Sequence, residues 1–274
     1  MSININSNII SIADRIANRF NEPIPLIEVA EEEFINVICD DYGSTSFDGL
    51  TWFEPDTDDF YIHLNTNQLK KNFPNKPKGR FTLAHELGHY FIPSHRLGLM
   101  RGLMKPHGSV NYLTDRGTWT IEREADAFAS ALLMPLNSVR EFVRRKPFCF
   151  ELIEDIASKY NVSKSAAALR FVDIGNCPIM VVFAVDGKIR WVSHSEDFPF
   201  RRLKYGSGRG DKVPENTVMG TYFYEKDNSD CQNEEIVYAR DCFQTRNKEE
   251  NENEFLEWCI DYKNSALSVF WENT

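Results

Sequence analysis

Apolar positions recur at helical spacing in four segments of the first half of the chain. Two of these segments, NIISIADRIANRF (8–20) and PLIEVAEEEF (25–34), lie near the start. The other two, residues 79–92 and 119–134, are each followed by a proline, which has no backbone donor and disfavours helix in the residue before it. We therefore predict four helices, of which the last two end before the prolines.

Two strand-like runs lie between these helices. GLTWFE (49–54) and FYIHLN (60–65) flank PDTDD, whose proline and aspartates suit a turn, so the pair predicts a β-hairpin. Residues 93–118 hold four glycines and two prolines and predict a loop-rich stretch.

The rest of the chain shows two further patterns. Residues 136–176 are helical by pattern, with a tight NVS turn before an alanine-rich helix. Residues 177–274 change to short β-like runs between turns, namely IMVVFAV, KIRWVS, MGTYFY, IVYA and ALSVFW. The acidic run at 246–255 predicts a solvated loop or a helix start. We expect an α+β protein with three parts, at residues 1–135, 136–176 and 177–274.

Composition and charge narrow the classes of function. With 42% hydrophobic and 26% charged residues, the chain has the composition of a globular protein. A net charge of −10 argues against broad binding to nucleic acid or anionic membranes, which both require a positive field.

The cellular compartment follows from the cysteines and from the start of the chain. The six cysteines are scattered without a C-x-x-C pair, so we expect reduced, mostly buried thiols and no thiolate metal site. The first residues lack the pattern of a signal peptide, and no apolar run approaches the roughly 18 residues that span a bilayer. We therefore expect a cytoplasmic protein without membrane contact.

The segment FTLAHELGHYF (81–91) carries the strongest chemical signal. His85 and His89 lie ~40° apart on a helix, so both imidazoles can reach one point, with Glu86 beside it. In such an H-E-x-x-H pattern the histidines hold Zn²⁺ and the glutamate takes a proton from the attacking water. The alternative is a pair of packed core histidines. It would require partners for three polar side chains within one buried turn, so the pattern favours a metal site.

A third ligand is expected from the helix at 121–134, which offers Glu122 and Glu124. Glu122 falls inside the apolar arc of this helix, whereas Glu124 lies ~160° away. Asp126, one turn beyond Glu122, is well placed to accept the N–H of a metal-binding histidine. Gly88 would allow the two helices to approach closely. The alternative is that the acidic residues only begin a helix and favour its dipole.

RFTLAHELGHY, followed downstream by EREADAFASALLMP, resembles the ImmA/IrrE family of bacterial and phage zinc metallopeptidases over residues 45–140. The resemblance implies a zincin-like domain with a small sheet and two metal-bearing helices. It implies one Zn²⁺ held by His85, His89 and Glu122, with Glu86 as the general base. It also implies a helix-turn-helix-like segment and a small β-rich C-terminal domain, for which a GAF-like fold is one candidate.

The activity implied by the resemblance is zinc-dependent hydrolysis of a peptide bond in a specific protein. The expected substrate is a helix-turn-helix repressor whose cleavage switches on a mobile-element or stress-response programme. Such enzymes often add a tyrosine or histidine donor to the oxyanion. The candidates are Tyr61, Tyr90, His95, His107 and Tyr112, of which Tyr90 is expected to point elsewhere.

The alternative function is a DNA-binding or ligand-sensing regulator with a structural or sensory metal site and no peptidase activity. Residues 140–173 carry seven basic and five acidic residues, and a net charge of +2 is weak for phosphate binding. The second helix of the segment offers only Lys164 and Arg170 to read bases. We expect these helices to brace the catalytic domain, with nucleic-acid contact through 150–172 as the alternative.

Overall fold

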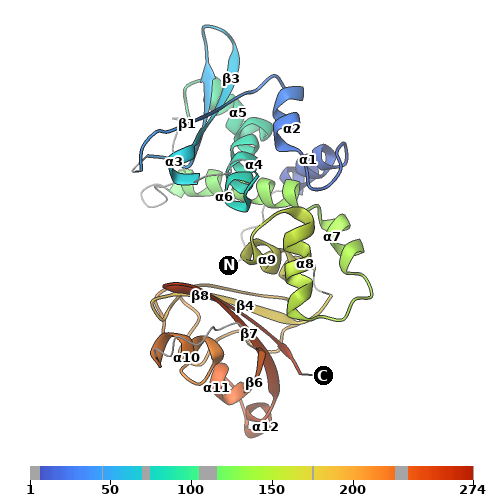
Figure 1. Cartoon of the computed structure of the whole chain (residues 1–274), viewed down its shortest axis with the longest axis vertical. Coiled ribbons are helices and arrows are strands. Elements are labelled where there is room, and N and C mark those ends of the chain that lie inside the picture. The colour runs from blue at the N-terminus through green and yellow to red at the C-terminus, as the bar shows by residue number, and fades with distance from the viewer. Residues whose placement is uncertain are drawn as a thin grey trace. The chain divides into compact units, whose positions relative to one another are not determined.

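The structure is a computed structural model of the whole chain, shown in Figure 1, and it describes residues 7–44, 46–69, 75–104, 116–174, 176–225 and 234–273. The chain forms two compact units. The first comprises Met1–Arg144 and Asp155–Ser163, and the second comprises Arg145–Glu154 and Lys164–Thr274. The helices at 136–176, predicted as a segment of their own, are therefore divided between the units. The three-part division of the chain stays a prediction.

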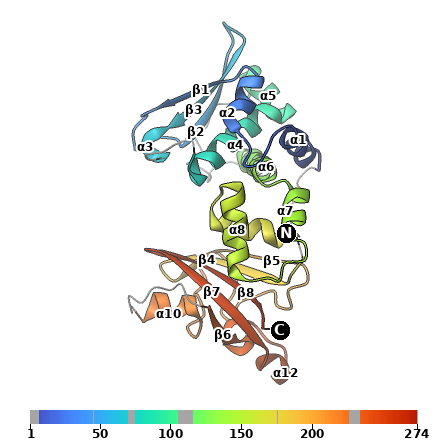
Figure 2. The ribbon, with the colours of Figure 1, turned by 45° about the vertical axis from the view of Figure 1, so that its right-hand side comes forward.

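The first unit combines helices with a three-stranded sheet (Figures 1 and 2). The sheet has the order β1-β3-β2, in which β1 is parallel to β3 and β2 is antiparallel to it. The strands are β1 (Asn36–Asp40), β2 (Gly49–Glu54) and β3 (Asp59–Asn65). The helices are α1 (Ser7–Ala17), α2 (Leu26–Glu32), α3 (Thr66–Leu69), α4 (Pro77–Phe91), α5 (Pro93–Met100), α6 (Arg116–Leu133) and α7 (Leu136–Val143).

Helix α4 is buried on nearly all sides, as the apolar pattern predicts. Pro77 occupies its first turn, where the missing N–H has no cost, and Pro93 opens the next helix instead of continuing this one. Leu83 and Leu87 are fully buried, because α4 contacts both α6 and the sheet (Figure 2). A polar side chain on this helix must therefore find its partner inside the protein.

The pleat of the sheet decides which side chains face α4. Ile62 and Leu64 of β3 are fully buried, whereas Tyr61 and His63 alternate with them and lie on the opposite face. In the antiparallel register Thr51 of β2 is directly opposite Ile62, so these two residues share the face that packs on α4.

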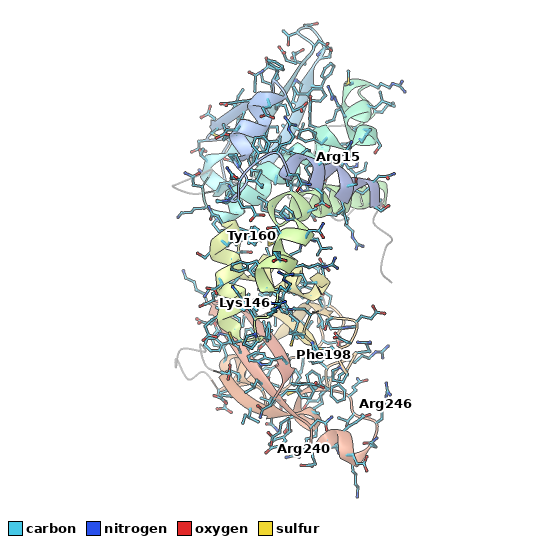
Figure 3. The ribbon with its side chains drawn as sticks, turned by 90° about the vertical axis from the view of Figure 1, so that its right-hand side faces the viewer. Arg15, Lys146, Tyr160, Phe198, Arg240 and Arg246 are labelled. Carbon is cyan, nitrogen blue, oxygen red and sulfur yellow. The ribbon has the colours of Figure 1, made fainter. Side chains whose placement is uncertain are left out.

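The second unit is built on a five-stranded antiparallel sheet of order β5-β4-β8-β7-β6. One face is covered by an apolar cluster that includes Phe198, labelled in Figure 3, with Phe243 and Phe255. On the other face Phe150 stacks on Trp258. The strands are β4 (Ile179–Val185), β5 (Lys188–His194), β6 (Glu234–Tyr238), β7 (Glu254–Tyr262) and β8 (Ser265–Glu272). The helices are α9 (Lys164–Ile174), α10 (Val218–Tyr224), α11 (Ala239–Cys242) and α12 (Lys248–Asn251), and α8 (Phe150–Tyr160) is shared with the first unit.

The segment MGTYFY, predicted as a strand, forms helix α10. The side chain of Thr217 accepts a hydrogen bond from the N–H of Gly220. The Glu257 carboxylate, on β7, accepts the backbone N–H groups of Val218 and Met219 at 2.7 and 3.1 Å. These caps satisfy donors that a helix start leaves open. A carboxylate about 40 residues away cannot be recognised as a cap from local sequence, and the aromatic and β-branched composition favoured a strand.

The elements that were not predicted include β7, β1 and α5, beside the short helices α3 and α11. β7 follows the acidic run, and its own Glu254, Glu257 and Asp261 interrupt the apolar alternation that identifies strands. Strand β1 has mostly exposed side chains and therefore no such alternation. Helix α5 lies in the stretch predicted as a loop. The acidic run itself contains α12, in agreement with a helix start.

The prediction that the cysteines are mostly buried is confirmed only in part. The five described cysteines are all free thiols, of which Cys242 and Cys259 are buried and Cys39 is exposed. Cys231 lies outside the described residues. Among the described helices, none combines the length and the apolar character that a bilayer crossing requires.

The buried acid of the second unit gives a pH-dependent prediction. Burial raises the pKa of Glu257 from its ordinary 4.5 to about 7, although Ser268 and the two backbone N–H groups oppose this. Because the folded-state value is the higher one, the stability that Glu257 contributes is complete below about pH 4.5 and is lost as pH rises through about 7. We expect the free energy of unfolding of wild type, relative to Glu257→Gln, to fall by roughly 3 kcal/mol across this window.

Urea unfolding of the two proteins at several pH values measures this difference. Glu257→Gln should also be less stable near pH 5, by about 1–3 kcal/mol, because one amide cannot accept all three donors. Parallel stability curves for the two proteins would contradict the assignment.

Candidate metal centre

Two neighbouring helices bring three predicted metal-binding side chains together. His85 and His89 lie one turn apart on α4, and Glu122 lies on α6. All three are almost completely buried, with exposed fractions of 3%, 4% and 3%. A Cβ atom on Gly88 would lie 3.1 Å from Cδ1 of Phe128 on α6 and 3.3 Å from the Cα of Ala125. The expected close approach of the two helices at Gly88 is therefore confirmed.

The distances within this cluster match those between the ligands of one small cation. The Nε2 atoms of His85 and His89 are 3.2 Å apart. The two Glu122 oxygens lie 3.2 Å from Nε2 of His85 and 3.5 Å from Nε2 of His89. Ligands at about 2.1 Å from a tetrahedral Zn²⁺ are roughly 3.4 Å from one another. The three residues therefore fit a zinc ion, with one tetrahedral position left over, and their role as ligands stays a prediction.

The electrostatics of the cluster also favour a positive charge. Burial lowers the pKa of His85, but hydrogen bonds to Asp126 and Glu122 and the charge of Glu86 outweigh it and raise the value to about 10. Without a metal, a proton on His85 supplies the positive charge that the cluster favours. A divalent cation held by the same atoms would supply more positive charge, because two carboxyl groups, those of Glu122 and Glu86, are buried there.

Asp126 of α6 contacts His85 on the side away from the cluster. Its Oδ1 is 2.9 Å from Nδ1 of His85. An ionised carboxylate can only accept, so Nδ1 carries a hydrogen, and Nε2 is the nitrogen that faces the cluster and would offer its lone pair to a metal. This contact would select the tautomer of His85 that binds a metal.

Glu86 is buried beside the cluster, and strand β2 holds its carboxylate. Its exposed fraction is 2%, and its Oε2 accepts a hydrogen bond from the Thr51 hydroxyl at 2.7 Å. The carboxylate is therefore held next to the candidate ligands, but it is not one of the three residues that could hold the ion.

A further histidine, His95, lies next to the cluster. It is buried on α5, with its ring centroid 5.2 Å from that of His89, and its Nε2 is 2.9 Å from Oε2 of Glu124. Burial lowers the pKa of His95, although Glu124 favours its charged form. Apolar periodicity places Glu124 on the outer side of its helix, and residues 93–118 were predicted as a loop, so this pair was not predicted.

The other oxyanion candidates do not approach the cluster or cannot be placed. The Tyr90 hydroxyl donates to Oε2 of Glu33 at 3.3 Å, away from the histidines, as expected. Tyr61 lies on the face of the sheet that is turned away from α4. His107 and Tyr112 lie outside the described residues.

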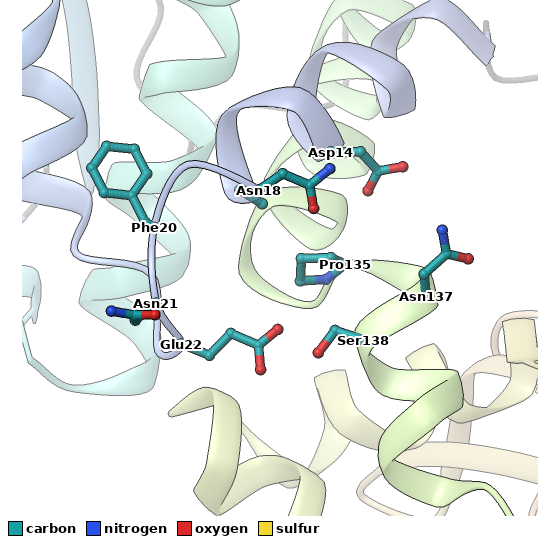
Figure 4. A pocket seen from close by; sticks show the side chains of 9 residues that line it. Asp14, Asn18, Phe20, Asn21, Glu22, Pro135, Asn137 and Ser138 are labelled. Carbon is teal, nitrogen blue, oxygen red and sulfur yellow. The ribbon is translucent and has the colours of Figure 1, made fainter.

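A separate pocket of about 460 Å³ lies between the end of α1 and the start of α7, where Figure 4 shows Asn18, Glu22 and Ser138 around it. It contains neither of the histidines nor Glu122. Two of its polar groups are already engaged, since Glu22 pairs with Lys159 at 2.7 Å and the Ser138 hydroxyl lies 2.8 Å from that of Tyr160. The pocket is thus distinct from the candidate metal centre.

Comparisons with known proteins match the region that contains the cluster. Residues 62–172 match the family model of the IrrE N-terminal-like domain, a peptidase family. The metallopeptidase ImmA of Bacillus subtilis (strain 168) is 27% identical over 150 residues, which are 54% of this chain and 76% of that protein. A solved structure of a Mycobacterium tuberculosis transcriptional regulator aligns with a TM-score of 0.58 and 14% identity, over 98% of this chain and 78% of that one. At this identity the likeness shows the fold alone.

Glu122 and Glu124 form a matched pair for testing the third ligand. We expect Glu122→Gln to weaken zinc binding by more than roughly 100-fold, because the change removes the only carboxylate of the ligand set. Loss of a ligand should cost more affinity than loss of a residue that only orients a ligand, which costs roughly 10- to 100-fold. Glu124→Gln on the same helix should keep one zinc per chain. Elemental analysis of the purified proteins, never exposed to chelators, measures this. Equal zinc in the two variants would remove Glu122 from the site.

Asp126→Asn tests the outer contact without removing a ligand. We expect zinc affinity to fall roughly 10- to 100-fold, because the amide no longer fixes the His85 tautomer. The Asp126 side chain is 47% exposed, so the fold should tolerate the change. Competition against a chromophoric chelator gives the affinity directly, and an unchanged value would mean that Asp126 has no role in metal binding.

Proposed function

We infer that this member of the ImmA/IrrE family is a zinc-dependent endopeptidase that hydrolyses a peptide bond in a specific protein. The observation that carries the inference is the buried group of His85, His89 and Glu122, at ligand-to-ligand distances of 3.2 to 3.5 Å, with Glu86 beside it. The family is one of metallopeptidases, and this chain retains the residues such chemistry requires.

His85, His89 and Glu122 would hold the ion. A bound Zn²⁺ supplies Lewis-acid chemistry, since it makes a water more acidic and offsets negative charge on the substrate carbonyl oxygen. The chain's own contribution is the buried ligand set and the orientation of His85 by Asp126. An electrostatic interaction in this buried setting is stronger than it would be in water.

Glu86 supplies the proton transfers. Its carboxylate takes a proton from the attacking water and then gives it to the nitrogen of the departing amine. The buried position and the hydrogen bond from Thr51 hold this carboxylate in one place during both transfers.

His95 is the best placed of the oxyanion candidates. Glu124 accepts from its Nε2, and Nδ1 has no hydrogen-bond partner within the described part of the chain. The second nitrogen is thus available to a reacting group beside His89. We propose that His95, in the charged form that Glu124 favours, donates a hydrogen bond from Nδ1 to the substrate carbonyl oxygen during the reaction.

The proposed substrate class comes from the family resemblance. We propose a helix-turn-helix transcriptional repressor, whose cleavage would switch on a mobile-element or stress-response programme. The protein would act in the cytoplasm, where such repressors bind DNA.

The alternative is a DNA-binding or ligand-sensing regulator, a class suggested by the name of the structural neighbour. The described contacts of α8 and α9 count against DNA reading through 150–172. Arg170 is 6% exposed and lies 3.6 Å from Asp173, and Lys164 forms an ion pair with Glu154. Neither cation projects freely toward a phosphate or a base edge.

Glu86→Gln tests the proposed chemistry. We expect the variant to bind zinc as wild type does and to cleave the repressor encoded next to its own gene roughly 10²- to 10⁴-fold more slowly, because an amide cannot take the proton. Cleavage is followed on gels and by mass spectrometry of the fragments. Removal of zinc by a chelator should stop the wild-type reaction, and zinc should restore it. Wild-type rates from Glu86→Gln would exclude Glu86 as the base.

A further inference from the structure

Strand β2 lies against the Glu86 carboxylate, with the Thr51 hydroxyl at Oε2 and the backbone of Gly49 on the side of Oε1. Thr51 and Gly49 are two residues apart on this strand, so they face the same side of the sheet. Thr51 is 4% exposed and Gly49 is buried, and α4 packs directly against them. Residues before the family-matched segment 62–172 therefore reach the proposed general base.

The Thr51 hydroxyl has two acceptors on the same residue. It lies 2.7 Å from Oε2 of Glu86 and 3.0 Å from the main-chain oxygen of Glu86. Its single hydrogen favours the carboxylate, because the bond is shorter and the acceptor is charged. When Glu86 carries a proton, the hydroxyl can accept from Oε2 and donate to the main-chain oxygen instead. Both states of a proton carrier are therefore satisfied without moving the side chain.

Gly49 limits the other oxygen. A Cβ atom at this position would lie 2.8 Å from Oε1 of Glu86 and 2.6 Å from the methyl carbon of Thr82, closer than real side chains come. The backbone of β2 thus forms a wall against Oε1 that only glycine allows. The carboxylate has a hydrogen bond on one side and this steric limit on the other.

We propose that Thr51 is a positioning residue that holds Glu86 in its reactive orientation, with Gly49 as the opposing wall. The proposal rests on the proposed function of Glu86 as proton carrier. A general base must keep hydrogen-bond distance to its reacting partner, and small displacements of such groups cost large factors in rate. Both acceptors of the Thr51 hydroxyl belong to Glu86, so Thr51 acts through that residue.

The variants Thr51→Val, Thr51→Ser and Thr82→Val separate positioning from packing. Valine has the shape of threonine without the hydroxyl and suits a strand, whereas serine keeps the hydroxyl. Thr82 is the matched control, since it is also a buried threonine next to Glu86, but its hydroxyl bonds to the Lys78 carbonyl at 3.1 Å. Valine at position 82 keeps the methyl group that faces Gly49.

The first measurement is the steady-state rate at which the zinc-loaded proteins cleave the proposed substrate, the helix-turn-helix repressor encoded next to the gene. We expect kcat of Thr51→Val to fall roughly 10- to 100-fold with KM within about twofold of wild type. Thr51→Ser should recover kcat to within about threefold, and Thr82→Val should match wild type. Equal losses in the two valine variants would overturn the proposal, because they would reflect general damage to the fold.

The second measurement does not depend on activity. Crystal structures of wild type and Thr51→Val should show one Glu86 rotamer in the first and a displaced or divided carboxylate in the second. Thermal unfolding checks that each variant is folded, and Thr51→Ala replaces Thr51→Val if valine is not accepted. An unmoved Glu86 without the hydroxyl would overturn the proposal. If wild type cleaves nothing, the proposed function fails while the crystal structures still decide the role of Thr51.

Discussion

Desolvation of charge at the contact of α4 and α6 is the constraint on which the first unit depends. Two imidazoles and two carboxylates lie there with almost no exposure to water. Buried charges of this kind are costly unless they are paired or bound to a metal. Several surrounding residues offset this cost by giving the buried groups partners or by allowing them to approach one another. Gly88 permits the helix contact, Asp126 orients His85, and Thr51 satisfies Glu86.

This arrangement explains why the site is distributed over several elements. A single helix can present two histidines to one point, but it cannot also direct a carboxylate at them from the opposite side. The second helix supplies that carboxylate, and the sheet supplies the hydroxyl of Thr51 that donates to Glu86. Each group is held by a regular element, which gives more precise positions than a loop would. The geometry of the cluster therefore depends on the packing of α4, α6 and the sheet against one another.

The parts that were predicted correctly are those that local spacing determines. The two central helices and the hairpin follow from apolar periodicity and from Pro93 and Pro135. The burial of Glu122 follows from its place on the apolar arc of α6. The errors arise where residues distant in the sequence determine the local structure. Helix α10 depends on the Glu257 cap, and the His95 pair with Glu124 depends on a helix in a stretch rich in glycine. The hydroxyl of Thr51 likewise gave no signal in the sequence.

Neither unit is continuous along the chain, because α8 begins in the second unit and ends in the first. Tyr160, near the end of that helix, is fully buried in the first unit, where its hydroxyl meets Ser138. During synthesis the ribosome must therefore release part of the second unit before the first can complete its core. The nascent first unit would stay unfinished until residue 163 has emerged, so its folding is timed by translation of a neighbouring segment rather than by its own length.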